Sequence, residues 1–306
     1  MIRATDRSRS ALHQPPGRRL PPPGGSQPWS RPRVRAADFD DRESLTRAFD
    51  GAERALVIST DALGRRVQQH GNAFDAAVRA GVGQLLYTSL ARAGESGNPL
   101  MPAPEHRATE RLLARSGVPF TVLRNNIYPD VLLELAPLRE AVKTGVLGSI
   151  SAISGTSGEG DIGYLGCIGY VGYVAREDCA AVGAALLAEG GHTGEYLDVT
   201  GPVAVSYAGI ADALTQATGR PVRFEARPEP ESAAAYAARG AEPERIAMAA
   251  QLWAAAREGW LDIATHAVER LTGRPATTLA EFFVRHREAL LGQVESDDDV
   301  DRSGSA

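Results

Sequence analysis

The chain has 306 residues, of which 43% are apolar and 23% are charged, a balance that is ordinary for a soluble globular protein. The formal net charge of −5 argues against a nucleic-acid-binding surface as the main function. No apolar run approaches the roughly 18 residues that span a bilayer, and the charged N-terminus has no apolar core of the secretory kind. We therefore expect a cytoplasmic protein with no nucleic-acid or membrane partner.

Lysine and cysteine usage exclude several kinds of chemistry. Lys143 is the only lysine, and no tyrosine is followed four residues later by a lysine, so the Tyr-x-x-x-Lys pair of ordinary short-chain dehydrogenases is absent. Cys167 and Cys179 form neither a CxxC pair nor a zinc-binding pattern. No second histidine stands at metal-ligand spacing from His106, so we expect no metal site.

The two ends of the chain have the composition of disordered segments. Residues 1–33 hold seven prolines and seven arginines without apolar periodicity. Such a segment cannot bury enough apolar surface to offset the entropy of ordering it. Residues 292–306 lead into an acidic, serine-containing tail. We expect both segments to be disordered and residues 34–291 to be folded.

Short apolar strands alternate with helices in the region between these ends. We expect strands at Val34–Asp38, Arg54–Ser59, Gln84–Thr88 and Phe120–Arg124, with helices over 41–50, 65–80 and 104–116. A helix (177–189), a strand (Glu195–Val199), a helix (205–218), a strand (Val222–Ala226) and further helices follow. This alternation predicts an α/β protein with a Rossmann-like, doubly wound parallel sheet. Residues 34–144 and parts of the C-terminal half would form it, with a smaller, mostly helical substrate lobe beside it.

Several short motifs follow one another along residues 34–291. They are Ala37-Asp38-Phe39, Val57-Ile-Ser-Thr60, Tyr87-Thr88-Ser89, Glu105-His106, Thr121-Val-Leu-Arg-Asn-Asn-Ile-Tyr128, Tyr173-Val-Ala-Arg-Glu-Asp178, Asp198-Val-Thr-Gly-Pro202 and Leu271-Thr-Gly-Arg-Pro275. In this order they resemble the NmrA-like atypical short-chain dehydrogenases, most closely the type 2 NAD(P)H:quinone oxidoreductases. The resemblance implies that NADPH, or NADH, is the cofactor and that a quinone-like small molecule is the substrate.

One defining element of that family is missing from residues 1–33. By the resemblance, a Gly-x-x-Gly-x-x-Gly turn should stand between an apolar strand and a helix. Its backbone N–H groups and the helix dipole would hold the cofactor pyrophosphate. Residues 1–33 hold neither such a strand nor that spacing. Two interpretations stay open: the gene product is truncated and re-framed at its start, or the protein has lost its main phosphate anchor.

A second glycine-rich run lies in a different context. Gly155-Thr-Ser-Gly158-Glu-Gly160 looks like a dinucleotide fingerprint but is not followed by a helical pattern. A fingerprint has meaning only between a strand and a helix, so we do not expect this run to bind a cofactor. It lies within the glycine-rich stretch 145–173, which by the resemblance contains a loop insertion beside the substrate pocket.

Polar or aromatic residues follow each predicted strand of the N-terminal half. A doubly wound sheet binds its ligand at the carboxyl ends of its strands. By the resemblance, Asp38 and Phe39 border the adenine, Ser59 and Thr60 lie along the ribose towards the nicotinamide, and Asn125 binds the carboxamide. The remaining candidates at these ends are Thr88, Ser89 and Asn126. For each, the alternative is a polar residue that caps a strand-to-helix turn.

Tyr128 is the candidate catalytic residue. Hydride arriving on a quinone carbon builds charge on the quinone oxygen, and a phenol O–H aimed at that oxygen lowers the barrier. The alternative is an interfacial tyrosine. His106 is expected to be a surface histidine near the start of a helix, with proton donation to the quinone as its alternative role.

The leading function is therefore hydride transfer from NADPH to a quinone-like acceptor. A non-enzymatic, NAD(P)-sensing regulatory protein and an inactive remnant are the alternatives. A sensor binds the dinucleotide without turnover, whereas a remnant does neither. We leave open whether the chain forms a homodimer.

Overall fold

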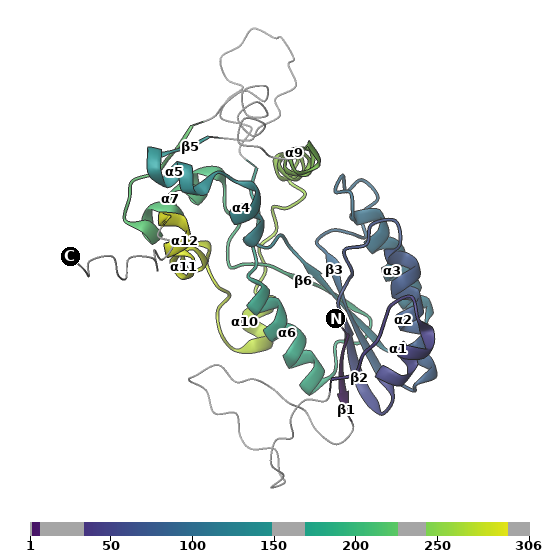
Figure 1. Ribbon diagram of the computed structural model, residues 1–306. Coiled ribbons are helices and arrows are strands. Elements are labelled where there is room, and N and C mark those ends of the chain that lie inside the picture. The colour runs from purple at the N-terminus through teal and green to yellow at the C-terminus, as the bar shows by residue number, and fades with distance from the viewer. Residues whose placement is uncertain (1, 7–33, 149–168, 226–242, 293–306) are drawn as a thin grey trace, which may run out of the picture. The chain divides into compact units, whose positions relative to one another are not determined.

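The computed structural model describes residues 2–6, 34–148, 169–225 and 243–292, and for 2–6 and 244–246 it describes the backbone alone (Figure 1). The chain divides into two compact units. The first, which we call the sheet unit, comprises Met1–Ile127, Arg176–Pro202 and Ile263–Ala276. The second, which we call the helical lobe, comprises Tyr128–Ala175, Val203–Asp262 and Thr277–Ala306.

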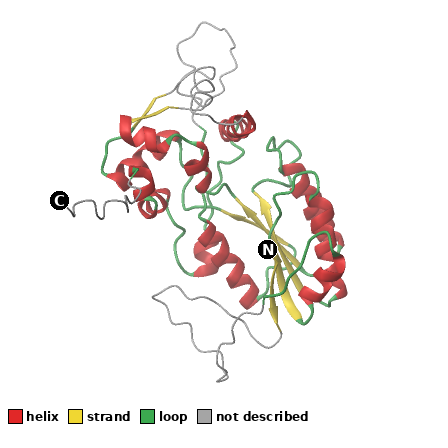
Figure 2. Ribbon diagram, viewed as in Figure 1, coloured by secondary structure: helices red, strands yellow, loops and turns green. Residues whose placement is uncertain are grey.

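The sheet unit contains a five-stranded sheet in the order β1-β2-β3-β4-β6. Its strands are β1 (Ile2–Asp6), β2 (Ala52–Val57), β3 (Gln84–Leu90), β4 (Phe120–Asn125) and β6 (Glu195–Val199). Strands β2, β3, β4 and β6 are mutually parallel, with Val57 opposite Tyr87 and Leu90 opposite Asn125. The helices that connect parallel strands lie on both faces of the sheet (Figure 2). These features confirm the predicted Rossmann-like α/β fold.

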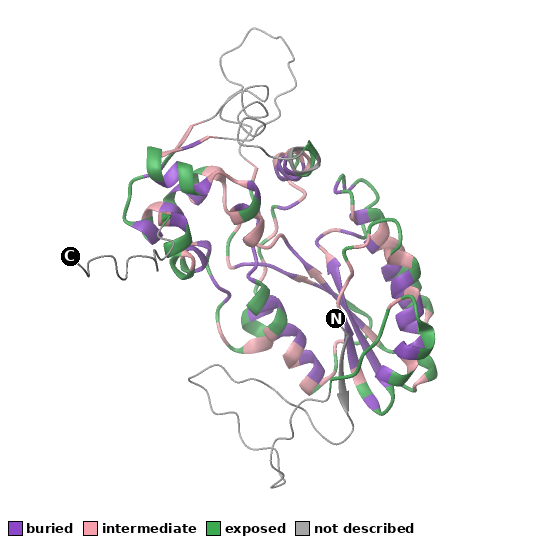
Figure 3. Cartoon of the chain, viewed as in Figure 1, coloured by how far each residue is buried: buried purple, intermediate pink, exposed green. Residues whose placement is uncertain are grey.

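Helices cover the sheet on opposite faces (Figure 1). One face carries α1 (Arg42–Phe49), α2 (Arg66–Arg79) and α3 (Ala103–Arg115), and the other carries α6 (Arg176–Glu189) and α10 (Ala267–Thr272). Covering on both faces explains why β3 is buried over its first six residues (Figure 3). Helix α6 approaches β2 closely at Gly183, where an added Cβ would lie 3.0 Å from Leu56 Cδ2.

Two predictions about the start of the chain are wrong. Ile2–Asp6, expected to be disordered, forms β1 and pairs antiparallel with β2, while residues 7–33 lie outside the described residues. A strand at the edge of a sheet pairs through its backbone N–H and C=O groups alone. The prolines that indicated disorder all lie after residue 6, so they do not prevent residues 2–6 from pairing. Val34–Asp38 is not a strand, because β1 ends the described sheet and no neighbouring strand pairs with these residues. The Arg35 side chain instead donates to the carbonyl of Asp50 at 2.6 Å.

The helical lobe is built from short helices and one small sheet. Its helices are α4 (Asp130–Leu135), α5 (Leu138–Thr144), α7 (Tyr207–Thr218), α9 (Pro243–Arg257), α11 (Leu279–Arg285) and α12 (Arg287–Leu291). Strands β5 (Val146–Gly148) and β7 (Arg223–Glu225) pair in parallel. The predicted main domain ran to residue 144, but α5 packs on β5, α7 and α12 and therefore belongs to the lobe. The glycine run at residues 155–160 lies outside the described residues.

Candidate functional site

Three pairs of predicted site residues lie at one edge of the sheet unit. Ser59 and Thr60 follow β2, Thr88 and Ser89 lie near the end of β3, and Asn125 and Asn126 lie at the end of β4. Because these strands are parallel and in register, their carboxyl ends meet at the same edge. The structure therefore brings these six residues together, as the sequence analysis expects.

The loop after β2 is bonded to the neighbouring strand. The Ser59 backbone N–H donates to Thr88 Oγ1 at 2.9 Å, and the Thr88 hydroxyl lies 3.4 Å from Ser59 Oγ. Thr88 is buried, whereas Ser59 is half-buried. This pair of contacts fixes where the chain leaves β2 and keeps the Ser59 side chain at the edge of the sheet.

Both asparagines at the end of β4 are almost fully buried. The Asn125 carbonyl accepts from the Ala91 N–H at 3.0 Å, and the Asn126 N–H donates to the Val199 carbonyl at 2.9 Å. Asn126 Oδ1 accepts from the Ile127 N–H at 2.9 Å. The Asn126 amide oxygen thus caps the turn after β4, which is the alternative that the sequence analysis gave for it.

Ser89 belongs to a buried ion-pair group. Its hydroxyl donates to Glu110 Oε1 at 2.7 Å. The Arg124 guanidinium makes a two-pronged contact with the same carboxylate, with Nε 3.0 Å from Oε1 and Nη2 2.7 Å from Oε2. The Glu110 carboxylate raises the pKa of Arg124, and the guanidinium lies 4.6 Å over the Tyr196 ring. The Ser89 hydroxyl is therefore part of a structural group that joins α3 to β4.

Asp38 and Phe39 lie in the turn before α1. The Asp38 carbonyl accepts from the Asp41 N–H at 3.0 Å, and its Oδ1 accepts from the Asp40 N–H at 2.9 Å. Asp38 is exposed, whereas Phe39 is half-buried and makes an edge-to-face contact with His70 at 6.2 Å between centroids. His70 in turn bonds the Thr60 backbone, so this imidazole links Phe39 to the loop after β2.

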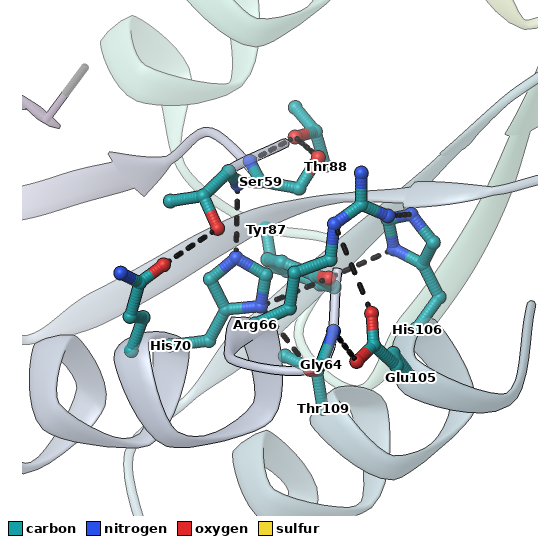
Figure 4. Close-up of polar contacts among 11 residues, drawn as sticks. Ser59, Gly64, Arg66, His70, Tyr87, Thr88, Glu105, His106 and Thr109 are labelled. Carbon is teal, nitrogen blue, oxygen red and sulfur yellow. Dashed lines mark hydrogen bonds and ion pairs between the residues drawn. The ribbon is translucent and has the colours of Figure 1, made fainter. Parts of the chain in front are cut away.

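A buried polar group that the sequence analysis missed lies behind this edge (Figure 4). Tyr87 on β3 places its hydroxyl 2.8 Å from His106 Nδ1 and 3.4 Å from His70 Nδ1. His70 Nδ1 is also 3.2 Å from Thr109 Oγ1. Burial, together with the smaller effect of the nearby Arg66 charge, lowers the pKa of His70 to about 4 and that of His106 to about 3. Both histidines are neutral at pH 7.

The expectation that His106 is a surface residue is therefore wrong. It lies on the buried face of α3 together with Ala103, Glu110 and Leu113. These residues are spaced three, four and three positions apart, which is the period of one helix face. This face holds two ionisable residues, so a search for apolar periodicity alone does not find it. The same spacing on α2 joins His70 to Phe74 and Ala77.

Tyr128 begins the helical lobe, immediately after the sheet unit ends at Ile127. The side chain is half-buried, and the Tyr128 carbonyl accepts from the Val131 N–H at 3.1 Å. Pro129 is the N-cap of α4 and fixes the direction in which the chain leaves. The chain passes from Asn126 at the sheet edge to the candidate tyrosine within two residues.

The described residues fit the two halves of a dinucleotide differently. The edge formed by β2, β3 and β4 offers hydroxyl and amide groups suited to a ribose and a carboxamide. The pyrophosphate needs free backbone N–H groups at a helix start, but the Asp41 carboxylate accepts from the Glu43 and Ser44 N–H groups at the start of α1. In addition, β1 is antiparallel to β2, so its last residue, Asp6, lies at the opposite edge, beside Ala52. The nicotinamide half fits, and the described residues show no glycine-rich turn for the pyrophosphate.

No three His, Cys, Asp or Glu side chains with described positions gather as metal ligands would. Among the helices that the structure describes, none combines the length and apolar character needed to cross a membrane.

Comparison with known proteins places the chain in a family. Residues 25–131 match a family model described as NAD(P)H-binding. Quinone oxidoreductase 2 of Escherichia coli (strain K12) is 36% identical over 250 residues, which are 81% of this chain and 80% of that protein. The crystal structure of an NADPH-dependent quinone oxidoreductase from Escherichia coli in complex with NADPH is 34% identical and covers 83% of each chain, with a TM-score of 0.69. The Citrobacter sp. triphenylmethane reductase in complex with NADP(H) is 26% identical over 83% of each chain, also with a TM-score of 0.69.

These similarities agree with the order of motifs from Asp38 to Pro275. They extend through the sheet unit and the helical lobe alike, because the aligned share exceeds four fifths of this chain. The resemblance that the sequence analysis identified is confirmed. The chain belongs to the NmrA-like family of NAD(P)H-binding proteins.

Proposed function

We propose that this protein is an oxidoreductase that transfers hydride from NADPH to a quinone-like acceptor. The observation that carries the proposal is the polar edge of the sheet unit, where Ser59, Thr88 and Asn125 lie at or just beyond the carboxyl ends of three successive parallel strands. A ligand that lies along this edge meets hydroxyl and amide groups in the order in which the strands occur. The names of the similar Escherichia coli and Citrobacter proteins support a reductase, and the name of the Escherichia coli protein favours a quinone as the acceptor.

Within this proposal each residue group has a separate task. The Ser59–Thr60 loop lies along the ribose, and the buried Asn125 amide matches the donor and acceptor of the nicotinamide carboxamide. NADPH, when bound, supplies the hydride. The Tyr128 hydroxyl donates a hydrogen bond to the acceptor oxygen, on which negative charge develops. Because no Tyr-x-x-x-Lys pair is present, positioning of the two reactants accounts for most of the catalysis.

The test separates binding from turnover in the full chain. NADPH binding is measured by calorimetry, and NADPH oxidation with a small benzoquinone is followed by absorbance. Tyr128→Phe should leave the NADPH affinity nearly unchanged and lower kcat by roughly 10- to 100-fold, because the hydroxyl acts mainly in the transition state. Asn125→Ala, the matched variant for binding, should weaken NADPH affinity, because it removes a contact that is present before reaction.

Three other results would each change the proposal. Unchanged turnover in Tyr128→Phe removes Tyr128 from the mechanism. NADPH binding without turnover by the unmodified chain replaces the reductase with a dinucleotide sensor. The absence of both binding and turnover leaves an inactive member of the family.

A further inference from the structure

The loop between β2 and α2 is bonded at two points, by the buried His70 and the half-buried Glu105, which the proposed function does not use. At its start, the Thr60 backbone N–H donates to His70 Nε2 at 3.0 Å. Near its end, the Gly64 backbone N–H donates to Glu105 Oε1 at 2.6 Å. His70 comes from α2 and Glu105 from α3, so two helices hold the loop that carries Ser59 and Thr60.

The hydrogen-bond direction at Thr60 fixes the state of the imidazole. A backbone N–H can only donate, so His70 Nε2 must be unprotonated and the ring proton must be on Nδ1. That Nδ1–H faces Thr109 Oγ1 at 3.2 Å and the Tyr87 hydroxyl at 3.4 Å. His70 is fully buried, so water cannot replace these partners. A second proton on His70 would remove the acceptor from the Thr60 N–H.

The two bonding points belong to one connected group (Figure 4). Glu105 Oε2 lies 3.9 Å from Arg66 Nε, and Arg66 Nη1 lies 3.4 Å from His106 Nε2. The opposite nitrogen of His106 contacts the Tyr87 hydroxyl, which lies beside His70. The group therefore runs from the start of the loop, through the space between β3, α2 and α3, to the end of the loop.

A histidine with a purely structural role in the core could form its hydrogen bonds with any buried polar group. Here the bond goes to the backbone of a loop at the proposed binding edge. Neighbouring groups of the same loop are also held, because Thr60 Oγ1 donates to Gln69 Oε1 at 2.9 Å and the Ser59 N–H donates to Thr88 Oγ1 at 2.9 Å. The loop is thus fixed before any ligand arrives, and a fixed loop loses less conformational entropy on binding.

We infer that His70 is a positioning residue, which holds the Ser59–Thr60 backbone in its ligand-binding conformation through the Nε2 acceptor, with Glu105 holding the loop at Gly64. The inference rests on the proposed function for the identity of the ligand, NADPH. It does not make His70 a catalytic residue, because the ring contacts the loop backbone and reaches no reacting atom.

The first measurement needs no variant. Nitrogen NMR of the unmodified protein near pH 7 should show His70 with a protonated Nδ1 and an unprotonated Nε2, hydrogen-bonded to the Thr60 amide. Slow hydrogen exchange of the Thr60 amide should accompany it, because its N–H is bonded to a buried acceptor. A protonated Nε2, or fast exchange of the Thr60 amide, would overturn the inference.

The second measurement compares three variants in the full chain. His70→Leu should speed exchange of the Thr60 amide and weaken NADPH binding by about tenfold, the scale of one hydrogen bond. His70→Gln, whose side-chain oxygen can reach the Nε2 position, should restore both to within about threefold. Phe49→Leu serves as the control, because Phe49 is a fully buried core residue of α1. It should lower the melting temperature without changing either property.

The outcomes separate this inference from the proposed function. Faster Thr60 exchange in His70→Leu with unchanged NADPH affinity would refute the positioning role and leave the proposed function intact. Equal losses of NADPH affinity in His70→Leu and Phe49→Leu would show that His70 acts only by stabilising the core, and would refute the positioning role. If the unmodified chain binds no NADPH, the proposed function fails, and the nitrogen and amide measurements still decide whether His70 holds the loop.

Discussion

Two regions of the sheet unit differ in how their polar groups are bonded. At the carboxyl edge of β2, β3 and β4, loop backbones bond to buried side chains such as Thr88 and His70. The second region, which we call the corner, comprises residues 34–49, that is α1 and the segment before it. There Val34 is 95% exposed, and the turn before α1 is held by the acidic residues Asp38 and Asp41. The difference teaches that the ends of parallel strands can gather hydroxyl and amide groups at one edge without any special turn. A pyrophosphate site needs a particular turn and a helix start with free N–H groups.

The largest effect is expected at the carboxyl edge, from breaking its ion pair. Arg124→Met leaves the Glu110 carboxylate buried without its cation, which should cost about 3–5 kcal/mol of the free energy of unfolding. The double variant Arg124→Met/Glu110→Leu should recover most of that loss, because no charge is then left uncompensated. Urea unfolding measures both changes.

A matched control uses an exposed pair at the corner. Arg47→Met removes the contact of Arg47 with Glu43, a pair whose two side chains are mostly exposed. It should change the free energy of unfolding by less than about 0.5 kcal/mol. Similar losses for Arg124→Met and Arg47→Met would show that the edge is no more strongly bonded than the corner.

A smaller effect is expected from acid acting on the buried histidines. Folding lowers the pKa of His70 to about 4 and that of His106 to about 3, whereas a histidine in the unfolded chain has a pKa of about 6.5. As the pH falls below 6.5, these two histidines therefore take up protons in the unfolded chain before they do so in the folded chain. Their stabilisation is complete above pH 6.5 and is lost as the pH falls. The loss approaches about 1.4 kcal/mol per pH unit for each histidine.

Urea unfolding at several pH values between 6.5 and 5 measures this slope while most carboxylates stay ionised. His106→Asn keeps an amide near the Nδ1 position that can bond to the Tyr87 hydroxyl. It should reduce the slope by about 1.4 kcal/mol per pH unit, which corresponds to one proton. His266→Gln, at a histidine whose side chain is 86% exposed, should leave the slope unchanged. A slope that is the same in all three proteins would mean that other groups cause the acid sensitivity.

The fold was largely predictable because its strands carry local signals. β2, β3 and β4 contain apolar runs between glycine and polar turns, and all four parallel strands, β6 included, lie within two residues of their predicted bounds. Residues 2–6 and 34–38 were predicted wrongly because pairing depends on which strand lies next to a segment, and the local pattern does not contain that information.

The candidate site was predictable only in part, for a related reason. Ser59, Thr88 and Asn125 meet at one edge because parallel strands align their carboxyl ends, so their positions follow from the strand assignments. The burial of His70 and His106 depends on the packing of α2 and α3 against β3, which apolar periodicity does not reveal when the buried face contains polar residues. The roles of Tyr128 and of the cofactor-contacting residues stay predictions.

The most direct test of the comparison comes from rebuilding the part of the chain that leads into the corner. Residues 1–33 would be replaced by a strand, a Gly-x-x-Gly-x-x-Gly turn, a helix and a second strand. The first new strand should pair in parallel with β2 where β1 now pairs antiparallel, so that its turn opens at the carboxyl edge. NADPH affinity measured by calorimetry should rise at least about tenfold, or about 1.4 kcal/mol, because the pyrophosphate gains backbone N–H donors. A graft with each turn glycine changed to alanine is the control and should show no gain, since a Cβ hinders the close approach of phosphate to the backbone. If the original chain already binds NADPH as tightly as the graft, another part of the chain holds the phosphates, and the corner is not deficient.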